Sequence, residues 1–357
     1  MNLRATAVLS MMAALMLFVV SLLWLRQADR RQRGLVVYCA HDLLYAEPIL
    51  RDFERRTGIP VEVVGDTEAS KSLGLIQRLL REPAGSCDVL WNNQIAGTDR
   101  LQQAGLLIPY RGTGWNRIPE RFKDFQGHWT GFAARMRLWI TRAPQLAANQ
   151  QAIHDFLAKS DWSHFAIAKP MYGTTLTQYS VYQEQWGLKS LRAWHQQFQN
   201  RGGKFVPGNA AVKDLVAAGA CVLGMTDTDD YFVARDDHAD VAMRPIELGD
   251  LNLEAVRELT FDPHAVFVIP NTVAILRGTQ RLPEAQQLVD YLLSAETELK
   301  LARSTSRQIP LGGAAPEELP PEVLELLPAL ERALDLRNLT AAQAACLEWL
   351  SNDEPAN

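Results

Sequence analysis

The sequence lacks the short motifs that mark several enzyme classes. It has no GxSxG turn, no GxxxxGK[ST] loop and no GxGxxG segment after an expected strand. The usual indications of a serine hydrolase, a P-loop nucleotide-binding protein and a dinucleotide-binding enzyme are therefore absent. Nothing in the chain argues for catalysis, and we expect a protein that is not an enzyme and requires no cofactor.

Cysteine is also scarce. The chain has four cysteines, at positions 39, 87, 221 and 346, and they lie far apart with neither CxxC nor Cys/His spacing. The histidines show no HxxxH spacing. These patterns predict neither a disulfide framework nor a zinc site.

The chain is short of positive charge outside its first segment. The net charge is −5, and residues 1–34 contribute five arginines and one aspartate, or +4, so the remainder carries about −9. A body this acidic is a poor match for nucleic acid or for an anionic membrane surface. We expect no nucleic-acid partner, and we expect a monomer.

One long apolar run opens the sequence. Residues 5–25 contain no charged side chain and are long enough to span a bilayer. No small-x-small cleavage pattern precedes Leu35, so residues 1–34 are interpreted as a signal anchor, with a cleaved signal peptide as the alternative. Four arginines follow the run and one precedes it, and that count by itself would place the body in the cytoplasm.

The next segment has the pattern of a β-strand, a short helix and a second strand. Residues 35–38 and 59–64 are apolar and rich in β-branched residues, and between them a helix starts near a proline and ends at a glycine. In an open α/β sheet, ligands bind at the carboxyl ends of such strands. His41, Asp42 and the loop 65–68, which contains Asp66 and Glu68, are therefore candidate binding residues.

Polar residues follow several later strands in the same way. Trp91 and Asn92 end the expected strand at 88–91, Thr174 and Thr175 open a helix after the strand at 165–168, and a third group follows the strand at 221–225. A hydroxyl pair at a helix start can hold an anion. The third group comprises Asp227, Asp229, Asp230 and Tyr231.

Each of these groups has a simpler interpretation. The three aspartates would repel one another in a closed site unless a cation or a donor neutralised them, but one of them could instead cap a helix while the others face solvent. Trp91 and Tyr231 could stack on a ligand or lie in the core. Arg135, within an extended segment at 129–140, is either an inward countercharge or a surface residue.

Taken in order, these segments resemble a known family. The chain is similar to the periplasmic solute-binding proteins of ABC transporters, in the ferric-iron-binding branch of the extracellular family 1 type. The resemblance covers residues 35–310 and rests on the segments VVYCAHDLLYAEPILRDFERRTGIPVEVV, DVLWNN, GFAARMRLWIT, KPMYGTT, AAGACVLGMTDTDD, IPNTVAILRG and QIPL.

The resemblance implies an α/β protein with a two-lobed periplasmic-binding-protein type II fold, crossover hinge strands and a helical C-terminus. The implied division is residues 35–134 for lobe 1, 135–263 for lobe 2, 264–310 for a return to lobe 1, and 311–357 for C-terminal helices packed on lobe 2. It also implies an exported body, periplasmic and possibly anchored to the inner membrane by residues 5–25, beside an ABC permease.

The implied function is capture of ferric iron, with a synergistic anion, or of another cationic solute in the interlobe cleft. His41 and Glu68 match metal-ligand positions of the family, and Arg135 matches an anion-holding arginine. Asp229 and Asp230 stand where iron-binding members carry paired tyrosines, so they are the remaining metal candidates. Alternatives are an organic solute such as thiamine, a polyamine or a phosphorylated compound, or a membrane-anchored enzyme on the same scaffold.

Overall fold

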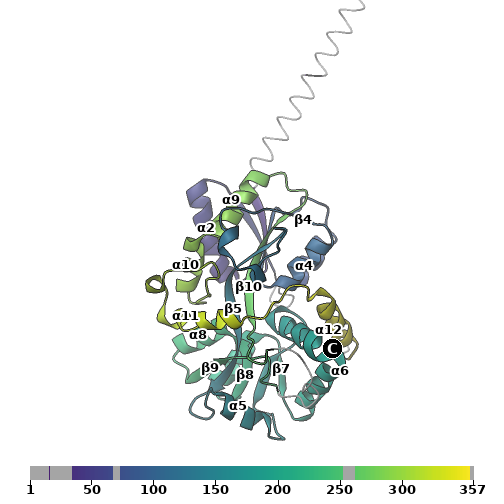
Figure 1. The fold of residues 1–357 in the computed structure, drawn as a ribbon, viewed down its shortest axis with the longest axis vertical. Coiled ribbons are helices and arrows are strands. Elements are labelled where there is room, and N and C mark those ends of the chain that lie inside the picture. The colour runs from purple at the N-terminus through teal and green to yellow at the C-terminus, as the bar shows by residue number, and fades with distance from the viewer. Residues whose placement is uncertain (1–15, 17–33, 67–72, 252–261, 354–357) are drawn as a thin grey trace, which may run out of the picture.

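The computed structural model describes residue 16 and residues 34–66, 73–251 and 262–353. Figure 1 shows two halves stacked along the long axis, with strands β5 and β10 passing between them. Within the described ranges, no helix is both long and apolar enough to cross a membrane. Apart from Met16, the expected membrane segment 5–25 lies outside these ranges, and so does Glu68.

A ten-stranded sheet runs through both halves in the order β2-β1-β3-β10-β5-β8-β6-β7, with β4 beside β10 and β9 beside β5. We call the half with β1 to β4 and β10 lobe 1, and the half with β6 to β9 lobe 2. The strands are β1 Leu35–Cys39, β2 Val61–Gly65, β3 Val89–Asn92, β4 Leu107–Ile108, β5 Thr130–Arg142, β6 Phe165–Ala168, β7 Lys204–Val206, β8 Leu223–Asp227, β9 Val241–Pro245 and β10 Val268–Leu276.

Helices cover the faces of this sheet. They are α2 Leu43–Thr57, α3 Leu73–Leu79, α4 Ile95–Gln103, α5 Gln150–Leu157, α6 Gly173–Asn200, α7 Asn209–Ala217, α8 Thr228–Asp236, α9 Leu282–Leu292, α10 Ala295–Arg303, α11 Pro321–Leu324 and α12 Thr340–Asp353. Single 3₁₀ turns lie at 115–117, 120–122 and 316–318, and a longer one lies at 327–332.

The first βαβ unit forms where the sequence pattern predicts it. Strands β1 and β2 pair in parallel, and α2 packs its apolar face, which includes Leu50 and Phe53, against them. The helix ends at Gly58, whose φ of 70° is the left-handed conformation that glycine adopts at low cost. Because β1 ends at Cys39, this unit places His41, two residues later, at the carboxyl edge of the sheet.

Strand β5 connects the lobes. It pairs with β10 in lobe 1 and with β8 and β9 in lobe 2, and every residue of it except the last is buried. Strand β10 is continuous through Pro270 and Asn271, and its register against β5 shifts between these two residues. Opposite the shift, Ala133 has a φ of 41°, so both crossover strands are irregular at the same level.

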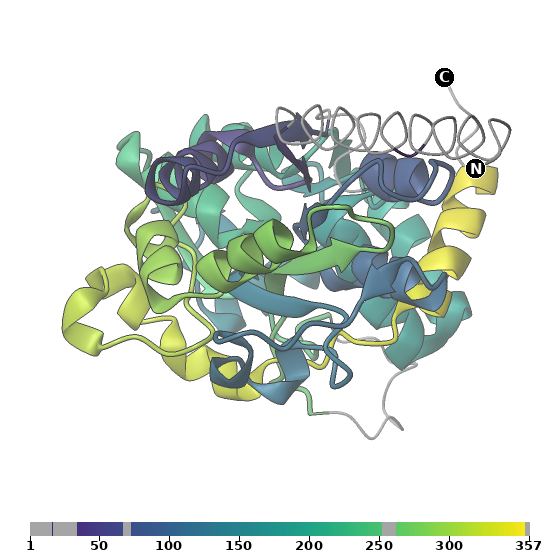
Figure 2. The ribbon, with the colours of Figure 1, turned by 90° about the horizontal axis from the view of Figure 1, so that it is seen from above.

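The C-terminal tail contacts both lobes. Helix α12 packs against α6 of lobe 2 and also against α4 of lobe 1. Figure 2 shows α12 beside these two helices at one edge of the molecule. The Thr340 hydroxyl accepts a hydrogen bond from Gln103 of α4 at 3.3 Å, and the Trp349 ring lies edge-on to His195 of α6.

Candidate functional site

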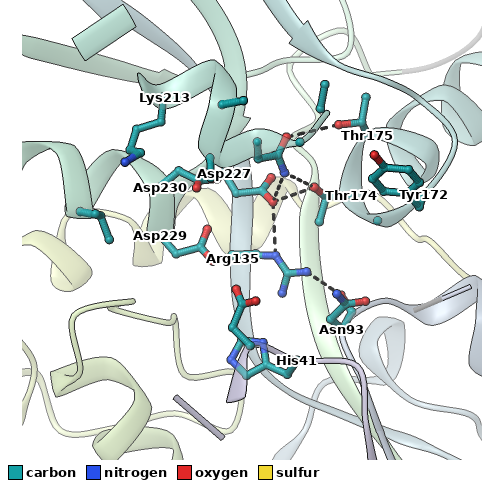
Figure 3. A pocket seen from close by; sticks show the side chains of 18 of the residues that line it. His41, Asn93, Arg135, Tyr172, Thr174, Thr175, Lys213, Asp227, Asp229 and Asp230 are labelled. Atoms are coloured by element: carbon teal, nitrogen blue, oxygen red, sulfur yellow. Dashed lines mark hydrogen bonds and ion pairs between the residues drawn. The ribbon is translucent and has the colours of Figure 1, made fainter. Parts of the chain in front are cut away.

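A cavity of about 730 Å³ lies between the lobes. Lobe 1 supplies the residues after β1 and the first turn of α2, β5 supplies Arg135, and lobe 2 supplies the first turns of α6, α7 and α8. Helix N-termini carry unpaired N–H groups and a partial positive charge, so three of them at one wall favour acceptors there. Figure 3 shows Arg135 between His41 and the aspartates of lobe 2.

His41 forms part of the lobe 1 wall. It is 4% exposed, and its ring stacks on Trp91 at 5.6 Å and lies 5.9 Å from the ring of Tyr45. Its Nε2 is 2.7 Å from the amide nitrogen of Gln308. A metal ion would therefore have to displace this hydrogen bond or use the other ring nitrogen.

Arg135 is 5% exposed and crosses the middle of the cavity. Its Nη2 donates to the carbonyl oxygen of Asn93 at 2.8 Å, and its Nε donates to Asp227 at a long 3.4 Å. Its Nη1 is buried and has no partner among the described residues. The inward alternative left open by the sequence is thus the one observed, with one guanidinium nitrogen unpaired.

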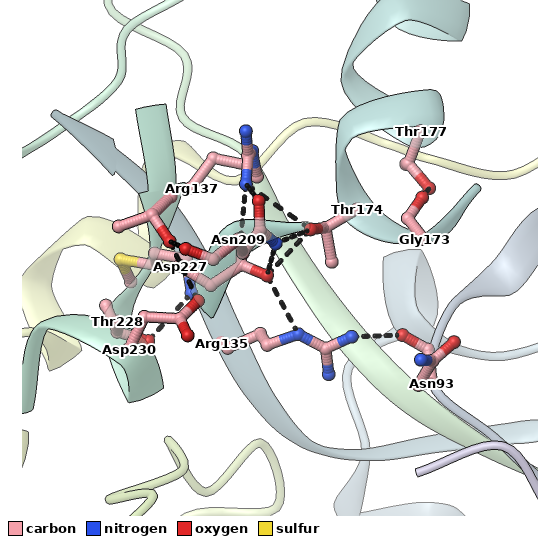
Figure 4. A network of polar contacts seen from close by, with 12 residues as sticks. Asn93, Arg135, Arg137, Gly173, Thr174, Thr177, Asn209, Asp227, Thr228 and Asp230 are labelled. Carbon is pink, nitrogen blue, oxygen red and sulfur yellow. Dashed lines mark hydrogen bonds and ion pairs between the residues drawn. The ribbon is translucent and has the colours of Figure 1, made fainter. Parts of the chain in front are cut away.

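Asp227 is held by four donors behind this wall. Arg137 Nη1 donates to Oδ1 at 2.9 Å, while Oδ2 accepts from Thr174 Oγ1 at 2.6 Å, from Asn209 Nδ2 at 2.9 Å and from Arg135. Figure 4 shows these side chains converging on one carboxylate. Asp227 is 3% exposed, and these charged and polar donors compensate its negative charge inside the protein.

Asp229 and Asp230 begin helix α8 beside this network. One carboxylate oxygen from each of Asp227, Asp229 and Asp230 lies within 4.8 Å of the others. Burial and the repulsion between these carboxylates raise the pKa of Asp229 well above its usual value and raise the pKa of Asp230 to about 6. Thr226 donates to Asp230 at 2.8 Å, whereas Oδ1 of Asp229 is buried without a partner in the described ranges.

The capping alternative does not explain these acids. Asp227 occupies the N-cap position of α8 but makes no side-chain capping hydrogen bond. Asp229 and Asp230 lie in the first turn, where the helix dipole favours a negative charge, yet their carboxyl groups line the cavity. The pair is therefore both stabilised by the helix and available to a bound cation.

The structure brings most of the predicted site residues to one cavity. Those that line it are His41, Asp42, Arg135, Thr174, Thr175, Asp227, Asp229 and Asp230. Residues that sequence reasoning missed include Tyr45, Asn93, Tyr172, Asn209 and Lys213. The sequence pattern could have predicted Asn209 as a site residue, because it begins a helix shortly after a strand, as Thr174 does.

Other predicted residues lie elsewhere. Trp91 is fully buried in the lobe 1 core against Phe132, and Asn92 is buried, with its amide donating to Gln94 and Thr98, so neither forms the expected cleft wall. Tyr231 packs against Phe232 rather than lining the cavity. Asp66 accepts a hydrogen bond from the first turn of α3 at 3.3 Å and does not line the cavity either.

The fold and the cavity define a two-lobed α/β binding protein. Residues 49–324 match the family described as bacterial extracellular solute-binding protein, and the chain belongs to this family. The expected class and fold are thereby confirmed. Because the family is one of solute-binding proteins, it also agrees with the expectation that the chain is not an enzyme.

Curated relatives are similar over part of their length. The chain is 24% identical over 195 residues to the Fe(3+)-binding periplasmic protein of Serratia marcescens, which is 54% of this chain and 56% of that protein. It is 24% identical over 204 residues to iron uptake protein A1 of Synechocystis, which is 56% of this chain and 53% of that protein. The chain therefore spans about half the length of the curated relatives it matches.

Solved structures share the fold over most of the chain. Iron-bound HitA from Pseudomonas aeruginosa has a TM-score of 0.68 at 20% identity, covering 87% of this chain and 97% of that one. AfuA from Actinobacillus pleuropneumoniae with fructose-6-phosphate bound has a TM-score of 0.68 at 15% identity, covering 89% and 98%. The Trichodesmium protein in complex with iron and citrate has a TM-score of 0.65 at 16% identity, covering 90% and 99%.

Proposed function

We propose that this chain is the extracytoplasmic solute-binding component of an ABC importer, and that it captures a small cation between its lobes, with ferric iron as the first candidate. The observation that carries this proposal is the placement of acids on both sides of one cavity. Asp42 comes from lobe 1, whereas Asp229 and Asp230 come from lobe 2.

The charge balance of the lining favours a cation. The described lining holds four aspartates against two basic side chains, Arg135 and Lys213. Lys213 forms an ion pair with Asp214 at 2.6 Å, and Asp227 is compensated by Arg137 at 2.9 Å, so Asp229 and Asp230 are the lobe 2 acids that a bound cation would neutralise. Carboxylate oxygens are the ligands that hard cations prefer.

Capture would follow from closure of the cleft. A cation bound between Asp42 and the pair Asp229 and Asp230 offsets the repulsion between the two lobe 2 carboxylates. The same cation attracts the carboxylate of Asp42 and so draws lobe 1 toward lobe 2. Strands β5 and β10 are irregular at the same height, at Ala133 and at the register shift. Rotation of the lobes about this point would break fewer regular backbone hydrogen bonds than rotation elsewhere along the two strands.

Ferric iron is favoured because curated relatives are named as iron-binding or iron-uptake proteins. The lining adds two phenols, Tyr45 on the lobe 1 wall and Tyr172 on the lobe 2 wall. Burial raises the pKa of Tyr45, and a hydrogen bond to Thr305 works in the opposite direction. Bound iron would lower that pKa and allow the Tyr45 phenolate to join His41, Asp229 and Asp230 as a ligand, with Glu68 a further candidate from the sequence.

A second candidate is an organic solute, and a specific observation favours it. The cavity of about 730 Å³ is far larger than a bare ion, and its lining includes Arg135, whose buried Nη1 has no partner in the described ranges. AfuA with fructose-6-phosphate shows that a neighbour with this fold holds a phosphorylated solute. Thiamine, polyamines and phosphorylated sugars therefore belong in the same screen.

The screen measures the melting temperature of the purified full-length chain. Ferric iron, supplied with carbonate or citrate, should raise Tm, because a ligand that binds the folded state stabilises it by mass action. The shift should shrink in Asp230→Asn and persist in Asp237→Asn, a matched substitution at an exposed position just after α8. No shift with iron, together with a clear shift with an organic compound, would reject the iron assignment.

The transport role needs a separate test. We expect the body to lie in the periplasm, possibly anchored to the inner membrane through residues 5–25, and to deliver its solute to an ABC permease. Fractionation of the producing cells should place the chain outside the cytoplasm, and crosslinking should recover a permease subunit. A chain found in the cytoplasm would contradict this role whatever it binds.

A further inference from the structure

The carboxylate of Asp227 occupies a donor set of the kind that proteins use for oxyanions. Two guanidinium groups, a hydroxyl and a side-chain amide surround it, from Arg135, Arg137, Thr174 and Asn209. Thr174 lies in the first turn of α6 and Asn209 begins α7, so two helix N-termini aim at the same place. Charged donors combined with helix N-termini form an anion site.

Space around these donors is otherwise open toward the cavity. A Cβ atom added at Gly173, which begins α6, or at Gly208, which precedes α7, would have no neighbouring atom within 4 Å. Both glycines line the cavity. Arg135, Thr174, Asn209 and Asp227 also line the cavity, whereas Arg137 is fully buried behind them. The acceptor of this donor set is the protein's own carboxylate.

Neighbours of the same fold hold an anion or an anionic group with their cargo. One is in complex with iron and citrate, and another holds fructose-6-phosphate. In this chain, a free oxyanion at the donor set would lie against Asp227. Two like charges about 4 Å apart at an effective dielectric constant of about 20 repel enough to lower affinity roughly 1000-fold.

We propose that Asp227 is a built-in anion, which fills the donor set that a co-bound anion would otherwise occupy, so that the site takes its cation without a free oxyanion. This inference rests on the proposed function, because it describes how the same cavity selects its solute. It predicts a positively charged solute without a phosphate or carboxylate group directed at Thr174 and Asn209.

The test asks whether the oxyanion response is created by removing the charge of Asp227. Tm is measured for the full-length chain and for Asp227→Asn in about 10 mM phosphate and in sodium chloride of the same ionic strength. Wild type should show no difference between the two buffers. Asp227→Asn should melt at least ~2 °C higher in phosphate, because the arginines and Thr174 become free to bind it.

A matched variant separates this effect from a general loss of negative charge. Asp230→Asn removes the same charge from the same wall, but Asp230 accepts from Thr226 rather than from the arginines, so it should gain no phosphate response. A wild type that phosphate stabilises, or an Asp227→Asn that it does not, overturns the inference. If Asp227→Asn fails to fold, stabilisation of the wild type by phosphate still overturns the inference and its absence upholds it.

A second arm keeps this inference separate from the proposed function. Wild type receives ferric chloride, freshly diluted from acid, in the chloride buffer with and without an equimolar amount of phosphate, and iron should raise Tm equally in both. A rise that requires phosphate overturns the inference. If iron leaves Tm unchanged in both buffers, the iron assignment fails, while the phosphate comparison still decides the role of Asp227.

Discussion

Asp230→Asn should stabilise the ligand-free protein while weakening its capture of a cation. The pKa of the Asp230 carboxyl is raised from 3.8 to about 6 by burial and by the charge of Asp227. The folded protein therefore holds this proton more tightly than the unfolded chain does, and ionisation of Asp230 costs stability. A change of about two pKa units corresponds to about 3 kcal/mol once the group is fully ionised.

The direction of the Asp230 pKa shift determines the pH range over which the stability difference appears. Because the folded pKa is the higher one, the penalty grows as pH rises from about 4 to about 6 and is complete above that range. Asparagine keeps an oxygen for the Thr226 hydrogen bond and carries no charge. Asp230→Asn should therefore gain about 2 to 3 kcal/mol at pH 7.5, about half of that at pH 5 and almost nothing below pH 4.

Thermal melts and urea titrations of the ligand-free protein at these pH values measure the gain. A domain of 150 to 250 residues shifts its Tm by roughly 2 to 4 °C per kcal/mol, so the increase at pH 7.5 should be roughly 4 °C or more. Asp237→Asn, at an exposed position, should change stability by less than about 0.5 kcal/mol. An Asp230→Asn protein that gains nothing at pH 7.5, or gains equally at all three pH values, would refute the reasoning.

Three further substitutions test other parts of the structure. Burial raises the pKa of Asp99, which accepts a hydrogen bond from Trp129, to about 6. Wild type should therefore gain about 1 kcal/mol relative to Asp99→Asn between pH 7 and pH 5 in urea titrations, and a pH-independent difference would contradict this. Trp91→Ala should lose about 3 to 5 kcal/mol by opening a cavity in the lobe 1 core, and a loss below 1 kcal/mol would place Trp91 outside that core. Arg137→Met should lose about 3 to 5 kcal/mol because it leaves Asp227 short of its shortest charged partner; equal stability of mutant and wild type by denaturant titration would show that the remaining donors suffice.

Local signals were enough to predict the first βαβ unit. Its strands are short apolar runs, and its helix is bounded by chain features that act within a few residues, such as Gly58. Strand β9, Val241–Pro245, was not predicted, since it is half-buried and is stabilised by pairing with β5, about a hundred residues earlier. Such pairing leaves little trace in the strand's own pattern.

The candidate site was predicted in outline, and its errors have a common cause. Placing residues at strand ends brought His41, Arg135 and the aspartates to one cavity, but that rule does not give the direction of a side chain. Strand β3 continues through Asn92, so Trp91 is still inside the strand and faces the core. Tyr231 lies on the side of α8 that packs against the apolar cluster containing Met136 and Val268.

The tail gives the two lobes a second connection beside the crossover strands. The backbone N–H of Asn338 donates to Asp99 of lobe 1 at 3.1 Å, and α12 then continues to Trp349 against α6 of lobe 2. A body joined to another at one place can swing and twist in several directions. Because these lobes are joined at two places, we expect their relative motion to be restricted mainly to rotation about the line through both connections.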